Sequence, residues 1–151
     1  MLQLECETTP EQIRVMQDKI LAVAVDRGAD QLRQSRMLLV LDEILTNLRH
    51  HAYPEKPGPV RIEILPRIGR DDSLLHLRVH DWGPPFNPLR DSEPPVFNDT
   101  LDDRPAGGLG LYLVYNMVCG LRYERAWEEP PSRGRNQLSL SFPLMPPKDR
   151  R

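Results

Sequence analysis

Cysteine, excess charge of one sign and long apolar runs are all scarce in this sequence, and each scarcity excludes a class of protein. The two cysteines, Cys6 and Cys119, have neither disulfide-framework nor zinc-site spacing, so we expect both to be reduced and buried. The formal net charge of −2 gives no reason to expect a nucleic-acid partner. No apolar run is long enough for a membrane span, and the acidic N-terminal segment does not resemble a signal peptide. We therefore expect a cytoplasmic protein that binds neither nucleic acid nor membrane.

The composition is that of an ordinary folded domain. Hydrophobic residues make up 39% of the 151 residues and charged residues 28%, which is typical of globular proteins. A chain of this length can bury a substantial core as one unit. We assign residues 1–145 to a single domain and expect residues 146–151 to fray.

Hydrophobic periodicity predicts the order of the secondary-structure elements. Thr9 and Asp30 have the residue types and positions of helix N-caps. This order predicts an α+β fold of two layers, in which helices cover one face of a mixed sheet. The expected strands are residues 2–7, 60–65, 74–81, 121–127 and 137–144, and the expected helices are about 10–26, 31–51 and 108–119.

A proline-rich segment interrupts this pattern. Residues 84–105 contain six prolines and show no apolar periodicity. The segment is too long for an ordinary connection, and such loops are usually lids, binding loops or disordered segments.

Glu43 and Asn47 lie one turn apart on the second expected helix. We expect both to lie opposite a stripe of leucines formed by Leu38, Leu41 and Leu45, with Leu48 at its end. One interpretation is two polar residues on a solvated face. The other is a carboxylate that acts as a general base beside an amide oxygen that binds Mg²⁺.

Asp81 continues the alternating row of Leu75, Leu77 and Val79 to the end of its strand. A carboxylate on a buried face needs a partner, because an unpaired buried charge is costly. Asp81 is therefore either a turn residue or an acceptor at the floor of a pocket, for example for an exocyclic amine. His76 and His80 fall on the opposite, solvent-facing side of the strand, whereas Trp82 and Trp127 are expected in the core or at an interface.

Three glycines precede the third expected helix in the stretch "RPAGGLGLYLV". Glycine costs a helix interior roughly 1 kcal/mol relative to alanine. It also lets the backbone approach a phosphate at a helix N-terminus. The stretch completes neither a dinucleotide fingerprint nor a P-loop. What remains is a glycine hinge between a loop and a helix.

Taken in order, "DEILTNLRHHAY", "HDWGPPF" and "GGLGLYLV" resemble the N, G1 and G2 boxes of the GHKL ATPase superfamily. Within it, the chain looks most like the anti-sigma-factor serine kinases, and the resemblance covers nearly the whole chain in element order. It implies the Bergerat ATP-binding fold, with ATP and Mg²⁺ as cofactors.

The resemblance also implies a role for each matching position. Glu43 would be the catalytic base, Asn47 would bind Mg²⁺, and Asp81 would accept from the adenine amino group. Residues 84–106 would form the ATP lid, and residues 51–53 a structural turn. The other implied nucleotide-binding positions are Gly83, Phe86, Arg104, Gly107, Gly108, Leu109 and Gly110.

These roles predict an ATP-dependent protein serine kinase of a partner-switching system. By resemblance it would phosphorylate a small antagonist protein of the STAS type on serine and sequester a sigma factor or similar regulator, and proteins of this family commonly form homodimers. The alternative is a non-catalytic module of the same fold that captures a regulatory protein with little use of ATP. The acidic residues of the lid favour this alternative, whereas the Glu43/Asn47 pair disfavours it.

Overall fold

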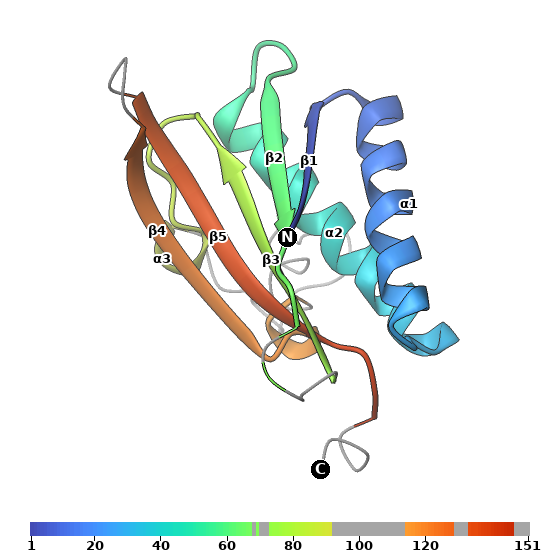
Figure 1. Ribbon diagram of the computed structural model, residues 1–151. Coiled ribbons are helices and arrows are strands. Elements are labelled where there is room, and N and C mark those ends of the chain that lie inside the picture. The colour runs from blue at the N-terminus through green and yellow to red at the C-terminus, as the bar shows by residue number, and fades with distance from the viewer. Residues whose placement is uncertain (68, 70–72, 92–113, 129–132, 147–151) are drawn as a thin grey trace, which may run out of the picture.

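The computed structural model describes residues 1–67, 69, 73–91, 114–128 and 133–146, and the descriptions below are limited to these. Most of the expected elements are present, although residues 114–117 are the only described helical part of the third expected helix. A short helix, α3, lies at the start of the expected lid, where the sequence shows no periodicity. The elements are β1 (Leu2–Glu7), α1 (Pro10–Asp26), α2 (Gln31–Ala52), β2 (Pro59–Ile64), β3 (Leu74–Asp81), α3 (Pro88–Asp91), β4 (Gly120–Glu128) and β5 (Arg133–Pro143) (Figure 1).

The strands form a five-stranded sheet in the order β1-β2-β3-β5-β4. Figure 1 shows α1 and α2 together on one side of this sheet, which confirms the two-layer α+β class. The sheet is not mixed, however, because every pairing of described strands is antiparallel. The chain passes through α1 and α2 between β1 and β2, and β2 starts at the same end of the sheet at which β1 ends. A parallel pair would need β2 to start at the opposite end, which a single crossover helix would allow.

Both expected N-caps start their helices. The Thr9 hydroxyl accepts from the Gln12 N–H at 3.3 Å, and the Asp30 carboxylate accepts from the Arg33 N–H at 2.9 Å. The Gln12 side chain accepts from the Glu7 N–H at 2.9 Å, which ties the start of α1 to the end of β1. These contacts satisfy backbone donors that have no partner within the helices.

The core lies between the helices and the inner face of the sheet. The leucine stripe expected on α2 is partly wrong, because Leu38 is 36% exposed and Leu48 is only partly buried. α2 packs against both α1 and the sheet, so its buried face is wider than a row of leucines. The buried apolar residues of α2 are Met37, Val40, Leu41, Ile44 and Leu45.

The outer face of the sheet is polar but not fully solvated. His80 was expected to face solvent, yet it is 1% exposed, and its Nε2 lies 3.3 Å from a carboxylate oxygen of Glu63. Its cross-strand neighbours, Arg61 and Gln137, have long side chains that can cover an imidazole. Burial lowers the pKa of His80, and the nearby Glu63 carboxylate opposes that shift.

One of the remaining surface residues departs from expectation. Cys6 and Cys119 are both free thiols, but Cys119 is exposed rather than buried. Trp82 is half-buried, with the guanidinium carbons of Arg61 and Arg133 at 5.1 and 4.5 Å from its ring, whereas Trp127 is 66% exposed. No helix in the described part of the chain is long and apolar enough to cross a membrane.

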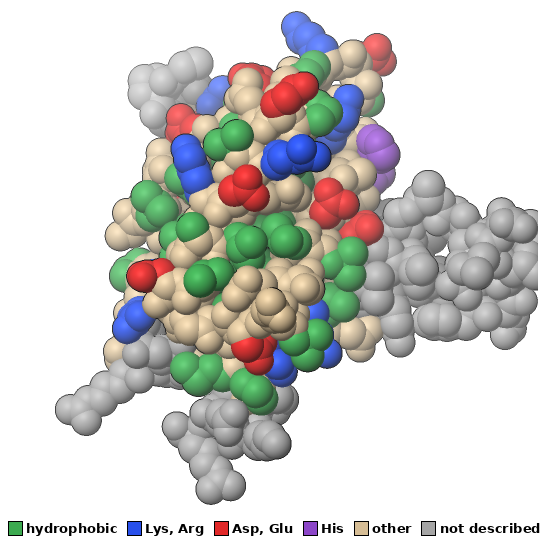
Figure 2. Space-filling view, turned by 90° about the vertical axis from the view of Figure 1, so that its right-hand side faces the viewer, with side chains coloured by type: hydrophobic (Ala, Val, Ile, Leu, Met, Phe, Trp, Pro, Cys, Tyr) green, Lys and Arg blue, Asp and Glu red, His purple; other side chains and the backbone are tan. Residues whose placement is uncertain are grey.

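The outward side of α1 carries Val15 and Val25 as exposed apolar residues. Figure 2 shows the side of the molecule on which this helix lies, where apolar and charged side chains are interspersed. Isolated exposed apolar residues of this kind are common on protein surfaces.

Candidate functional site

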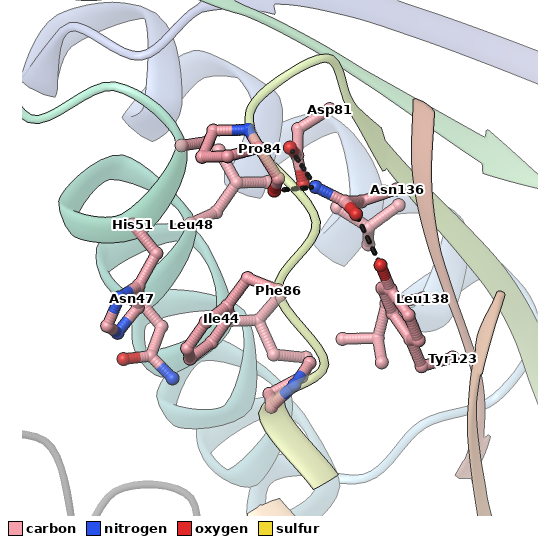
Figure 3. A pocket seen from close by; sticks show the side chains of 13 residues that line it. Ile44, Asn47, Leu48, His51, Asp81, Pro84, Phe86, Tyr123, Asn136 and Leu138 are labelled. Atoms are coloured by element: carbon pink, nitrogen blue, oxygen red, sulfur yellow. Dashed lines mark hydrogen bonds between the residues drawn. The ribbon is translucent and has the colours of Figure 1, made fainter. Parts of the chain in front are cut away.

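A pocket lies between α2 and the ends of β3 and β5 (Figure 3). α2 contributes Ile44, Asn47 and His51, and the sheet contributes Asp81 and Asn136. Apolar side chains from both α2 and the sheet form most of the pocket lining, and a few polar groups lie among them. This combination is typical of small-molecule sites, in which polar groups fix the orientation of a mostly apolar ligand face.

Asp81 reaches the pocket because it continues the buried row of β3, as the alternation of that strand predicts. Its Oδ1 accepts from the Gly83 N–H at 3.0 Å and from the Asn136 amide at 2.9 Å. Burial raises the pKa of Asp81, whereas these two hydrogen bonds and the nearby Arg125 guanidinium lower it. The result is a largely desolvated carboxylate that can accept from a ligand amine.

Asn136 was missed by the sequence analysis, which started the last strand at residue 137. In the structure β5 begins earlier, and Asn136 is the direct cross-strand partner of Asp81. A signal was present, since Asn136 continues the alternating inward row of Leu138, Leu140 and Phe142.

Gly83 allows the chain after β3 to pass close to the end of α2. A Cβ at this position would lie 2.5 Å from the Cα of Ala52. The next residue of the helix end, Tyr53, donates its hydroxyl to the Pro59 carbonyl at 2.6 Å and accepts from the Trp82 N–H at 3.0 Å. We expected Gly83 to allow close approach to a base, and the close approach observed is to Ala52.

Asn47 and Glu43 do not lie opposite the buried face of α2. Asn47 lies beside Ile44 at the border of that face, where its side chain lines the pocket. Glu43 is half-buried one turn earlier and is not among the described residues that line the pocket. The Asn47 side chain, which was expected to bind a metal ion, therefore lines the pocket, and Glu43 lies one turn earlier on the same helix.

His51 and Phe86 stack across one side of the pocket, with ring centroids 3.8 Å apart and an angle of 12° between the planes. Phe86 is an expected nucleotide-binding residue, but the sequence analysis gave His51 only a structural role. Its position one turn after Asn47 could have placed it on the same side of α2. Burial, and then the neighbouring His50, lower the pKa of His51, which favours a neutral ring.

The remaining predicted site residues are not described by the structure. Arg104, Gly107, Gly108, Leu109 and Gly110 lie outside the described residues, as do lid residues 92–106. Their roles stay predictions from the sequence.

The described residues fit an adenine nucleotide with Mg²⁺. A flat base suits the apolar wall around Ile44 and Leu138, and Asp81 offers an acceptor at the same wall. Mg²⁺ prefers oxygen ligands and usually keeps several waters and phosphate oxygens, so one amide from Asn47 is a sufficient protein contribution.

Comparisons with known proteins show which family the chain belongs to. The family model of the histidine kinase-like ATPase domain matches residues 6–142. The chain is 35% identical over 101 residues to the serine/threonine-protein kinase BtrW of Bordetella bronchiseptica, a match that covers 66% of this chain and 67% of that protein. It is 28% identical over 127 residues to the serine-protein kinase RsbW of Bacillus subtilis, with 82% and 77% covered.

A second RsbW, from Bacillus mycoides, is 26% identical over 120 residues, with 78% of this chain and 72% of that protein covered. The family match spans most of the chain and contains both strands and the helix that build the pocket. The chain therefore belongs to the histidine kinase-like ATPase family, the GHKL superfamily, and groups with its anti-sigma-factor-type serine kinases.

Proposed function

We propose that the protein is a cytoplasmic, ATP-dependent protein serine kinase of a partner-switching system. The observation that carries this proposal is the pocket in which Asn47 of α2 and Asp81 of β3 line one cavity. The names of the similar proteins, which are serine or serine/threonine kinases, support phosphoryl transfer to serine as the reaction.

Phosphoryl transfer depends mainly on positioning and on neutralising charge. Asn47 would hold a Mg²⁺ ion, which would supply positive charge to offset that of the phosphates. Glu43 would take the proton from the attacking serine hydroxyl, a contribution of roughly 10²–10⁴-fold. Because both residues are on α2, one rigid element would hold the proton acceptor and the metal ligand together.

The proposed substrate is a small antagonist protein of the STAS type, and the proposed second partner is a sigma factor or similar regulator. A protein partner needs an accessible contact surface, and the exposed Trp127 and the exposed apolar residues of α1 are compatible with one. A homodimer is part of the same proposal, since proteins of this kind commonly dimerise.

The proposal is tested with Glu43→Gln, matched by Asp42→Asn as a control. Asp42 is the exposed acidic neighbour on the same helix, so its amide variant makes an equal change of charge outside the site. We expect Glu43→Gln to abolish transfer of labelled phosphate from ATP to a STAS-domain antagonist of the same organism, while the control retains it. Transfer that survives in Glu43→Gln would contradict the assignment of the base.

The alternative function, a binding module that makes little use of ATP, predicts a different result for the unmodified protein. A kinase should gain about 2.7 kcal/mol of stability at a Mg-ATP concentration a hundred times its Kd. If millimolar Mg-ATP leaves the melting temperature unchanged and the protein still captures its regulator, the binding module is the better account.

A further inference from the structure

Asn136 uses all of its hydrogen-bonding capacity beneath the pocket. It is 5% exposed. Its amide oxygen accepts from the Tyr123 hydroxyl and from the Arg125 guanidinium, the latter at 3.0 Å. Its amide nitrogen donates to Asp81 Oδ1 and to the Pro84 carbonyl, both at 2.9 Å. An asparagine side chain has two acceptor and two donor positions, so none is left over.

This network fixes which way the Asn136 amide points. Arg125 can only donate, and the Pro84 carbonyl can only accept. A reversed amide would place its NH₂ group against the guanidinium and its oxygen against the carbonyl and the carboxylate. The observed orientation is therefore the one that Arg125 and Pro84 require, and it directs an N–H at Asp81.

The consequence for Asp81 is that its two oxygens are no longer equivalent. Oδ1 already accepts from Asn136 and from the Gly83 N–H. Within the described residues, no hydrogen bond reaches Oδ2, although Asp81 lines the pocket. An ionised carboxylate only accepts, so a ligand group that meets Oδ2 must be a donor.

We propose that Asn136, oriented by Arg125 and Tyr123, is the positioning residue that presents Asp81 to an amino group and so makes the pocket select adenine over purines with a carbonyl at the same carbon. The proposal rests on the proposed function, which supplies the nucleotide. The expected part is that Asp81 accepts from the base. The new part is that Asn136 and its two donors set this preference.

The selectivity follows from what each base offers to Oδ2. The adenine amino group donates to it, whereas the carbonyl of hypoxanthine places an acceptor against an acceptor. With the base in the same position, that repulsion would be relieved if Asp81 took up a proton. The Asn136 N–H opposes protonation by stabilising the charged form, against the effect of burial. The other groups near Asp81 are Arg125 of β4, Tyr53 at the end of α2, and His51 across the pocket.

The experiment compares ADP with inosine diphosphate, each with Mg²⁺, by isothermal titration calorimetry. Asn136→Asp keeps the acceptors for Arg125 and Tyr123 but removes the N–H that Asp81 receives. Gln137→Glu is the matched control, because it makes the same chemical change one residue later, on the opposite face of β5.

We expect the unmodified protein and Gln137→Glu to prefer ADP by about tenfold or more, since a hydrogen bond to a charged group commonly contributes that much. In Asn136→Asp the preference should fall to within about threefold. Two neighbouring carboxylates raise the pKa of one of them. The ADP affinity of this variant should therefore depend on pH more steeply than that of the unmodified protein.

The outcomes separate this inference from the proposed function. If the unmodified protein binds no nucleotide, both are overturned. If it prefers ADP and Asn136→Asp retains the full preference and the same pH profile, only the role of Asn136 is overturned. Should Asn136→Asp fail to fold, Arg125→Met decides. It removes the donor that, together with the Pro84 carbonyl, fixes the orientation of Asn136, so an unchanged ADP preference would overturn the inference and a reduced one would support it.

Discussion

The contact between Gly83 and Ala52 gives a prediction whose size can be worked out from the structure. Replacing Gly83 by alanine adds a Cβ that would lie 2.5 Å from both the Cα and the Cβ of Ala52, and 3.1 Å from its carbonyl oxygen. Two of these neighbours are backbone atoms near the end of α2, which cannot rotate away. We therefore expect either the segment after β3 or the end of the helix to move.

The expected cost is about 1–3 kcal/mol, the usual range for overpacking a well-packed site. Gly83 is not among the described glycines with positive φ, so the backbone can accept alanine without strain. At such a position alanine lowers the conformational entropy of the unfolded chain, which raises the free energy of unfolding by about 0.4–1 kcal/mol. The midpoints of these two ranges leave a net loss of about 1.3 kcal/mol. For a domain of this size it corresponds to a decrease of about 3–5 °C in melting temperature.

Thermal unfolding of Gly83→Ala and Gly120→Ala measures this difference. Gly120 is the matched control, because a Cβ there would meet nothing within 4 Å. We expect Gly120→Ala to stay within about 0.5 kcal/mol of the unmodified protein. Gly83→Ala should also bind Mg-ADP more weakly, since the Gly83 N–H donates to Asp81. The reasoning is refuted if both alanine variants melt at the same temperature.

Two further predictions concern the groups around the pocket and the outer sheet. Tyr53→Phe removes the hydroxyl that joins Pro59 to Trp82. We expect urea unfolding to show a free energy of unfolding lower by about 1–3 kcal/mol at an unchanged m-value. An unchanged urea midpoint would count against this prediction. Burial alone would raise the pKa of Glu128, but hydrogen bonds from Trp82, Arg133 and Arg135 hold it at about 2, below its usual value of 4.5. Glu128 therefore stabilises the fold above about pH 4.5, and this contribution is lost as the pH falls towards 2. The difference in melting temperature between Glu128→Gln and the unmodified protein should be greatest above pH 4.5 and shrink towards pH 2, whereas a constant difference would contradict this pKa.

The elements themselves could be predicted because their signals are local. The alternation of β3 and the caps at Thr9 and Asp30 gave boundaries that agree with the structure to within a residue or two. The direction of the strands was wrong because it depends on the path of the connections. The early start of β5 was missed because residues 133–136 have no apolar alternation, and their pairing with β4 holds them in the sheet.

The site was predicted in the parts that a single element carries. Asp81 extends the inward-facing row of residues on β3, and Asn47 lies one helical turn after Glu43 on α2. Asn136 could not be connected with Asp81 in this way. The two are far apart in the sequence and become neighbours only when β3 and β5 pair. Tyr123 and Arg125 are a further strand away, so their influence on Asp81 is invisible until the sheet order is known.

The place of Arg125 explains why the carboxylate of Asp81 stays available. The Arg125 guanidinium donates to the Gly83 carbonyl and to Asn136 rather than to Asp81. Gly134 leaves room for it, because a Cβ there would overlap the guanidinium. A direct pair between Arg125 and Asp81 would have the fork geometry that engages both carboxylate oxygens, and it would occupy an acceptor position on each of them. With Asn136 between them, the positive charge still favours an ionised Asp81, while Oδ2 accepts no hydrogen bond from any residue that the structure describes.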